Sequence, residues 1–137
     1  MKELLEENRR TPGGDYLLLE EGNHGYLEGF LIYGPTPMTD NGFDLYWIVV
    51  RKSAQRKGCG RKLATEMERR ILSAERDGIV RIETSGKDDY AGQRHFYISL
   101  GYRECGRIKD FYHRGDDLVT YCKRIFVEGT GRNKNLS

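Results

Sequence analysis

The sequence predicts one α+β domain in which helices pack on the faces of a mixed sheet. Its 137 residues suit a single domain, and its 37% hydrophobic and 32% charged residues are typical of a globular protein. Runs of strand-forming residues open and close the chain, and helical periodicity is strongest between them. No repeat or domain boundary interrupts this order, so residues 1–126 are predicted to form the domain and 127–137 a flexible tail.

The first third of the chain predicts a short helix and three strands. Lys2 to Arg10 favours the helix, which Pro12 ends. Two apolar runs, at 15–20 and 26–33, are separated by turn residues and predict a hairpin. The run from Asp44 to Val50 is rich in aromatic and β-branched residues and alternates little, which predicts a central strand covered on both faces.

The rest of the chain predicts two helices and three strands. Apolar residues recur at three- and four-residue spacing and predict a helix that ends at about Arg76: Cys59, Leu63, Met67, Ile71 and Ala74. The other predicted elements are a strand at Ile79 to Thr84, a helix at Asp88 to Leu100 with Gly101 as its C-cap, and antiparallel strands at Tyr102 to Lys109 and Leu118 to Phe126. The segment 110–117 between the last two strands is predicted to hold two turns.

Composition argues against several partners and sites. The net charge of +2 is too small to predict a nucleic acid or membrane partner. The N-terminus mixes both charges, and no apolar run reaches the roughly 18 residues that span a bilayer, so a cytoplasmic location is expected. Cys59, Cys105 and Cys122 are odd in number and lack CxxC spacing, which favours three reduced thiols. The histidines show no metal-ligand spacing, so no metal is expected.

The segment QRKGCG, residues 55–60, lies between the strongest strand and the strongest helix. The first N–H groups of a helix lack partners within it and carry the positive end of the helix dipole. Glycines at 58 and 60 would let a phosphate approach the backbone. Basic residues around them add positive charge: Arg56, Lys57, Arg61 and Lys62. The segment is therefore suited to bind a pyrophosphate.

Other motifs of this kind do not fit. A Walker A loop has Ser or Thr after Gly-Lys, whereas Arg61 and Lys62 follow Gly60. A dinucleotide-binding loop has a third glycine where Leu63 stands. The basic run at 51–62 also suggests nucleic acid, although such runs are usually solvated faces.

Two motifs, in this order, resemble the signatures of the GNAT superfamily of acyl-CoA-dependent N-acyltransferases. QRKGCG follows a strand and opens a helix, and it resembles the acetyl-CoA pyrophosphate loop Q/R-x-x-G-x-G/A. About 30 residues downstream, RHFY at 94–97 followed by LGY resembles the helix that carries Phe-Tyr and closes on Gly-Phe or Gly-Tyr. The resemblance covers Tyr16 to Phe126 and implies a mostly antiparallel central sheet flanked by helices. It also implies that most of the usual N-terminal strand and helices are missing, since only Lys2 to Arg10 is available for them.

The resemblance implies acetyl-CoA as co-substrate. In the superfamily the pantetheine arm pairs with the strand edge before the loop, where backbone N–H groups can polarise the thioester carbonyl. Tyr90 stands where many members have an asparagine that contacts the pantetheine. The residues implied to bind the cofactor are Ile48, Val49, Val50, Gln55, Arg56, Lys57, Gly58, Cys59, Gly60, Arg61, Tyr90 and Arg94.

The resemblance also suggests catalytic roles. Tyr97 matches the tyrosine that commonly protonates the leaving thiolate, which a phenol with a pKa near 10 can do. The attacking amine must first lose a proton, and two carboxylates are candidate bases, directly or through a water: Asp44 first and Glu83, on the neighbouring strand, second. No Ser-His-Asp or Cys-His set is suggested, so direct transfer is the simpler mechanism. Cys59 is interpreted as a helix-packing residue.

Three functions are compatible with these residues. The first is an N-acetyltransferase that acts on a primary amine of a small molecule, peptide or protein, in a site that is either open or completed by a second subunit of a homodimer. The second is a non-catalytic acyl-CoA-binding or regulatory domain, and the third a nucleic-acid-binding module. Acidic residues near the expected acceptor side would favour a cationic amine: Asp40, Asp44, Asp110, Asp116 and Asp117. Aromatic residues would form an apolar wall there: Tyr46, Trp47, Phe111 and Tyr112.

Overall fold

The computed structural model describes residues 16–23 and 25–127 and places in them a six-stranded sheet and two α-helices. The strands are β1 (Leu17–Asn23), β2 (Tyr26–Pro35), β3 (Gly42–Val50), β4 (Asp77–Ser85), β5 (Arg103–His113) and β6 (Asp116–Phe126). The helices are α1 (Cys59–Ala74) and α2 (Ala91–Ser99), each preceded by a short 3₁₀ turn, η1 (Lys52–Ala54) and η2 (Asp88–Tyr90). The predicted helix at Lys2 to Arg10 and the predicted tail beyond Val127 lie outside the described residues.

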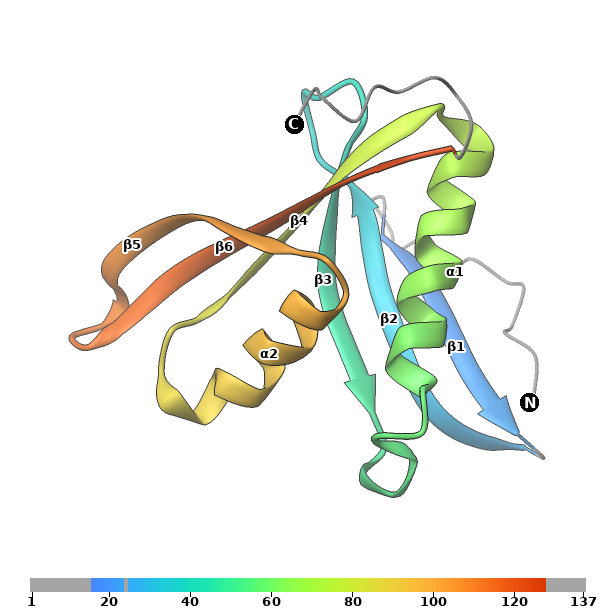
Figure 1. Cartoon of the computed structure of the whole chain (residues 1–137), viewed down its shortest axis with the longest axis horizontal. Coiled ribbons are helices and arrows are strands. Elements are labelled where there is room, and N and C mark those ends of the chain that lie inside the picture. Colours follow the sequence, from blue (N-terminus) through green and yellow to red (C-terminus); the bar gives the residue numbers. More distant parts are fainter. Residues whose placement is uncertain (1–15, 24, 128–137) are drawn as a thin grey trace.

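The sheet is mixed and mostly antiparallel, as predicted. Its strand order is β1-β2-β3-β4-β6-β5, and every neighbouring pair is antiparallel except β3 and β4. In Figure 1, β4, β6 and β5 form an arm that diverges from β1, β2 and β3. The sheet is therefore two antiparallel ribbons that meet along one short parallel contact.

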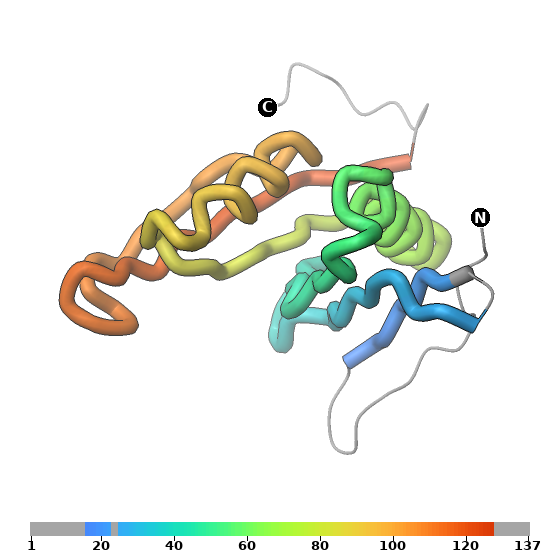
Figure 2. Tube along the Cα trace, turned by 90° about the horizontal axis from the view of Figure 1, so that it is seen from below, coloured from blue at the N-terminus to red at the C-terminus, as the bar shows by residue number. Residues whose placement is uncertain are grey.

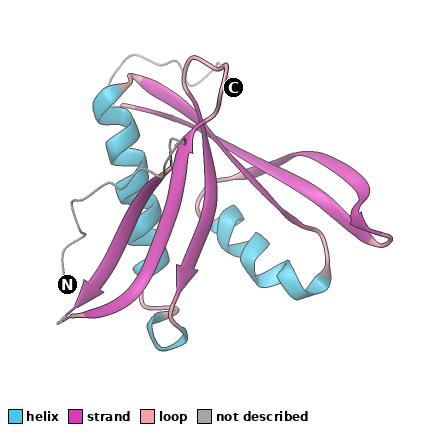
Figure 3. Ribbon diagram, turned by 180° about the vertical axis from the view of Figure 1, so that it is seen from behind, coloured by secondary structure: helices cyan, strands magenta, loops and turns pink. Residues whose placement is uncertain are grey.

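Both helices cover the same face of the sheet. Figure 2 shows α1 and α2 on one side of the strands, and Figure 3, from behind, shows the strands in front of both. The predicted apolar stripe of α1 is buried in the core except for its last residue, Ala74, which is exposed; Leu63 and Met67 are fully inaccessible. Burying each of these side chains contributes about 1.5–3 kcal/mol. In the described part of the chain, the opposite face carries no helix, and we call it the helix-free face.

Local backbone chemistry sets the helix ends. Gly58, in the left-handed region at φ 89°, precedes α1, and Gly101 at φ 103° follows α2 as the predicted C-cap. The first turn of the predicted helix at 88–100 is the 3₁₀ turn η2. None of the described helices is both long and apolar enough to cross a membrane.

Two predictions about strands are wrong. The segment 110–117 holds one turn, because β5 continues to His113 and the two-residue loop Arg114–Gly115 joins it to β6. The strand passes through an irregularity where Asp110 adopts a positive φ of 56°, which sequence periodicity does not reveal. Likewise β3 is not covered on both faces, since Trp47 is 63% exposed where the strand leaves β4.

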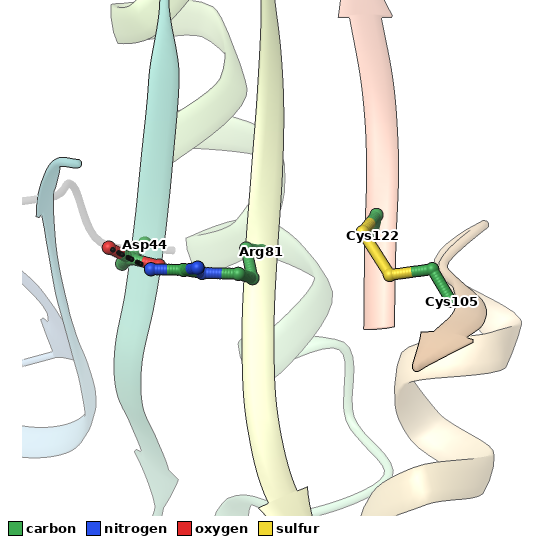
Figure 4. Close-up of a disulfide and its surroundings, with 4 residues drawn as sticks. All are labelled: Asp44, Arg81, Cys105 and Cys122. Carbon is green, nitrogen blue, oxygen red and sulfur yellow. Dashed lines mark hydrogen bonds and ion pairs between the residues drawn. A yellow bond between two sulfur atoms is a disulfide. The ribbon is translucent and has the colours of Figure 1, made fainter. Parts of the chain in front are cut away.

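Cys105 and Cys122 form a disulfide, so the prediction of three reduced thiols is wrong for two of them. The antiparallel register of β5 and β6 sets their Cα atoms 6.3 Å apart although 17 positions separate them in sequence. Figure 4 shows the bond bridging β5 and β6. An odd cysteine count carries no information about such cross-strand proximity. Cys59, the first residue of α1, is free and buried.

The two helices touch at a glycine. A Cβ on Gly60 would lie 2.8 Å from Cζ of Phe96, so the first turn of α1 can approach α2 only without a side chain there. The Arg61 side chain also reaches Ser99 at the end of α2. Gly60, predicted from the sequence to admit phosphate, is also buried against α2. Gly60 therefore fixes the distance between the helices.

We predict that Gly60→Ala and Gly92→Ala have opposite effects on stability. Both glycines are second in their helices, but a Cβ on Gly92 meets nothing within 4 Å. Gly92→Ala should raise the free energy of unfolding by about 0.4–1 kcal/mol. Gly60→Ala should lower the free energy of unfolding by about 1–3 kcal/mol relative to the unchanged protein, because Phe96 must move. Urea denaturation measures both, and equal effects would contradict the close packing.

Candidate active site

The site begins where β3 and β4 stop pairing. Their parallel contact comprises Gly42↔Ile79, Phe43↔Val80 and Asp44↔Arg81, and no pair follows. From there β3 continues beside β2, and β4 continues beside β6. The edge of β3 that faces β4 is thus unpaired from Leu45 to Val50. We call this divergence the fork.

An ion pair closes the fork at its apex. Arg81 donates from Nε to Oδ1 of Asp44 at 2.7 Å and from its second nitrogen to Oδ2 at 3.2 Å. The hydroxyl of Thr36 donates to the same Oδ2 at 2.7 Å. Bonding to Asp44 raises the pKa of Arg81. Figure 4 shows the two side chains bridging β3 and β4. Asp44 therefore accepts three hydrogen bonds at the last paired position.

Below this apex lies a cavity of about 570 Å³. Four parts of the chain line it: β3, the end of β4, the segment through η2 and α2, and the β5–β6 hairpin. The lining residues are Asp44, Leu45, Tyr46, Trp47, Ile48, Arg81, Glu83, Thr84, Ser85, Tyr90, Gln93, Tyr97, Tyr112, His113 and Asp116. The cavity thus contains all three predicted catalytic residues, Asp44, Glu83 and Tyr97.

The cavity has two chemically different sides. Alternate residues of a strand share a face, so Arg81, Glu83 and Ser85 point to the helix-free face together with Asp44. Tyr97 and Gln93 reach the cavity from α2, which covers the other face. Since the sheet is open at the fork, groups bound on the two faces can meet through it.

The helix-free side is acidic and aromatic. The Ser85 hydroxyl donates to Oδ1 of buried Asp116 at 2.5 Å. Glu83 lines the same side and makes no hydrogen bond or ion pair within the described part of the chain. Burial, and then the negative charges of Glu83 and Asp116, raise the pKa of the Tyr112 phenol. Tyr112 therefore lies close to both carboxylates.

Tyr97 is the buried acid of the helix-covered side. It is 4% exposed and packs against the rings of Phe96, Tyr102 and Tyr121. Burial raises its pKa to about 12, and a hydrogen bond from Gln93 partly opposes the shift. The phenol consequently keeps its proton throughout the physiological pH range.

The loop before α1 lies beyond the cavity. Its Gln55 side chain folds back to donate to the Val50 carbonyl at 3.0 Å. No side chain caps α1, and a Cβ on Gly58 would meet nothing within 4 Å, so the backbone there is accessible. Arg56, Lys57 and Arg61 are exposed around it. This turn can receive an anion as the sequence predicts.

Three other predicted cofactor residues differ in their surroundings. Tyr90 lines the cavity at the start of α2 and is partly exposed. Arg94 donates at 2.7 Å to the carbonyls of Ser85 and Lys87, so one of its nitrogens holds the connection between β4 and α2. Cys59 is buried, which raises the pKa of its thiol and makes it a poor nucleophile.

Sequence reasoning did not assign roles to Arg81, Gln93, Ser85 or His113, which also line the cavity. Two of them could have been found, because Arg81 and Ser85 alternate with Glu83 on one strand. His113 belongs to the part of β5 that was predicted as a turn. Among the described residues, no group of three or more His, Cys, Asp or Glu side chains is arranged to hold a metal ion.

Comparison with known proteins gives a family. A family profile described as an acetyltransferase (GNAT) domain matches residues 12–104. A protein from Desulfovibrio desulfuricans assigned to the GNAT family of acetyltransferases is 34% identical, with a TM-score of 0.76 over 80% of this chain and 68% of its own. No curated protein matches the chain in sequence.

More distant solved structures share the fold. The ribosomal-protein-S18-alanine N-acetyltransferase of Escherichia coli is 21% identical, with a TM-score of 0.69 over 89% of this chain and 77% of its own. The aminoglycoside 6'-N-acetyltransferase of Enterococcus faecium is 18% identical, with a TM-score of 0.72 over 84% of this chain and 77% of its own. Their substrates differ, so the shared fold does not identify an acceptor.

We predict that Asp44 and Arg81 are energetically coupled. A double-mutant cycle with Asp44→Ala and Arg81→Ala, followed by urea denaturation, should give a coupling free energy of about 1–2 kcal/mol. This value is smaller than for a fully buried ion pair, because Arg81 is partly exposed to solvent. The exposed pair Glu104–Arg107, 3.5 Å apart, is the control and should give less than about 0.5 kcal/mol. Equal coupling in both pairs would contradict a structural role at the fork.

Proposed function

The chain belongs to the GNAT family of acetyltransferases and is an acetyl-CoA-dependent N-acetyltransferase; we propose that it transfers the acetyl group directly to a primary amine that enters from the helix-free face. The observation that carries this proposal is the fork, which joins an acidic side to a side lined by a protonated phenol. Direct transfer needs both reactants in one opening, and the fork provides it.

The residues present fit acetyl-CoA. The unpaired edge of β3 offers backbone groups to the pantetheine amides, and the accessible turn at Gly58, with basic side chains around it, suits the pyrophosphate. Ile48 belongs to both the edge and the cavity, so an arm along β3 leads into the site. When bound, acetyl-CoA supplies an acetyl group activated as a thioester.

Glu83 is the better-placed general base. Asp44 already accepts three hydrogen bonds, two of them from Arg81, and taking up a proton would disrupt the apex of the fork. Glu83 makes no hydrogen bond or ion pair with the residues that the structure describes, and it lines the cavity. We assign proton removal to Glu83, directly or through a water, and a positioning role to Asp44.

Tyr97 completes the chemistry. Glu83 first takes one proton from the ammonium, directly or through a water. The amine nitrogen then forms a bond to the acetyl carbon as the carbon–sulfur bond breaks, Tyr97 gives a proton to the sulfur, and the second proton lost by the nitrogen restores the phenol through solvent. A phenol with a pKa of about 12 holds this proton until the thiolate develops. N–H groups of β3 are placed to donate to the carbonyl oxygen as it gains charge.

We predict that Glu83→Gln lowers kcat/KM by about 10²–10⁴-fold at pH 7 and by much less near pH 10. An alkylammonium has a pKa near 10, so at that pH about half of the acceptor is already a free amine and needs no base. Thiol release with acetyl-CoA and a simple primary amine measures the rate. Glu75→Gln, on the exposed end of α1, is the control for loss of charge.

A defect equal at all pH values would contradict the role of Glu83 as base. An absence of thiol release from the wild type with any amine would contradict the proposed transfer and favour a non-catalytic acyl-CoA-binding domain.

A further inference from the structure

The helix-free side of the cavity carries unbalanced negative charge. Three carboxylates line this part, those of Asp44, Glu83 and Asp116, against the single guanidinium of Arg81. The guanidinium of Arg81 is bound to Asp44 and also interacts with the charge of Glu83, so among the described lining residues the carboxylates exceed the Lys and Arg side chains by two charges. Among the described residues, the hydrogen-bond partner of the Asp116 side chain is the neutral Ser85 hydroxyl.

The carboxylates of Glu83 and Asp116 lie at different positions along the length of β4. Glu83 and Ser85 are alternate residues of one strand and share its face, with Cα atoms about 7 Å apart. Asp116 is bonded to the Ser85 hydroxyl and therefore lies one such step beyond Glu83. The Tyr112 phenol is close enough to both for their charges to act on it. Glu83, Asp116 and the Tyr112 ring therefore line one cavity together.

Such a surface suits a ligand with two positive charges. An ammonium over the face of a tyrosine ring gains a cation–π attraction, and a carboxylate adds a charge-assisted hydrogen bond. Trp47 and Tyr46 also line the cavity, and both side chains are exposed. One ammonium at Glu83 leaves Asp116 facing a second position.

The same charges reject an acceptor that carries a carboxylate. The cavity has one arginine, and its guanidinium is already bound by Asp44 from two nitrogens. The carboxylate of a free amino acid would therefore meet Glu83 or Asp116 without a counter-charge, which opposes binding.

We propose that the acceptor is a diamine-type dication, whose reacting amine lies at Glu83 while its second ammonium is held by Asp116 and Tyr112. The inference rests on the proposed function and names the substrate class of that site. It makes Asp116 a specificity-determining residue outside the proton-transfer steps.

Three acceptors of equal length test this inference: 1,4-diaminobutane, butylamine and 4-aminobutanoate. Each has a primary amine at one end of a four-carbon chain, and the other end is a second ammonium, a methyl group or a carboxylate. Because 1,4-diaminobutane has two equivalent amines, its kcat/KM is divided by two before the comparison. Thiol release from acetyl-CoA at pH 8 gives kcat/KM for each. We expect 1,4-diaminobutane to exceed butylamine by at least about tenfold, the equivalent of one ion pair of about 1.4 kcal/mol, with 4-aminobutanoate the poorest.

Asp116→Asn should bring the ratio of kcat/KM for 1,4-diaminobutane to kcat/KM for butylamine close to one. The amide still accepts a hydrogen bond from Ser85 but carries no charge to attract the second ammonium. Asp117→Asn is the matched control: it removes the same charge from the adjacent residue, which binds Arg107 outside the cavity, and should leave the ratio unchanged. Thermal unfolding shows whether each variant is folded. If Asp116→Asn does not fold, the wild-type ratio should instead decline as salt rises from about 0.05 to 0.5 M.

Equal rates with the diamine and the monoamine would overturn the dication assignment and leave the proposed transfer intact. If folded Asp116→Asn keeps the wild-type preference for the diamine in kcat/KM, the role of Asp116 is overturned. The role is overturned too if Asp117→Asn loses as much of this preference as Asp116→Asn. Absence of acetylation with all three acceptors would overturn the proposed function and this inference together.

Discussion

The architecture of the site depends on where β3 and β4 stop pairing. Parallel strands that remain paired would close the sheet, and no passage would join its two faces. Here the bond of Asp44 to Arg81, reinforced by Thr36, holds the strands together at their last paired residues. Beyond that point each strand keeps its pairing with its other neighbour, β2 or β6, while the backbone groups that face the fork have no strand partner. The open edge of β3 is thus compatible with a stable sheet.

The elements around the fork bring different chemistry to its two faces. On one face, the absence of a side chain at Gly60 lets α2 approach α1, and this packing places the buried Tyr97 at the cavity. On the other, the β5–β6 hairpin carries Tyr112 and Asp116 to the end of β4, where Ser85 binds the carboxylate. The disulfide ties the two strands of that hairpin together. A phenol that retains its proton and carboxylates that attract cations are therefore separated by the width of one sheet.

Local sequence signals predicted most of the elements and the family, whereas pairing between distant strands decided the rest. The stripe of Leu63 and Met67 predicted α1, and Gly101 predicted the end of α2, because these patterns depend only on neighbouring residues. Cys105 and Cys122 meet only through strand register, and the exposure of Trp47 follows from the departure of β4. From the sequence, Asp44 was the first candidate base and Glu83 the second. The Arg81 contact, made across 37 positions, distinguishes them.

The central claim is that the edge of β3 facing the fork is open to receive acetyl-CoA. Amide hydrogen exchange, followed by NMR with and without saturating acetyl-CoA, tests it most directly. The account predicts that, among residues 46–50, the amides that face β4 exchange quickly in the free protein and become protected when acetyl-CoA is added, while those bonded to β2 are protected throughout. Equal protection of both sets in the free protein, or no change on adding acetyl-CoA, would contradict it.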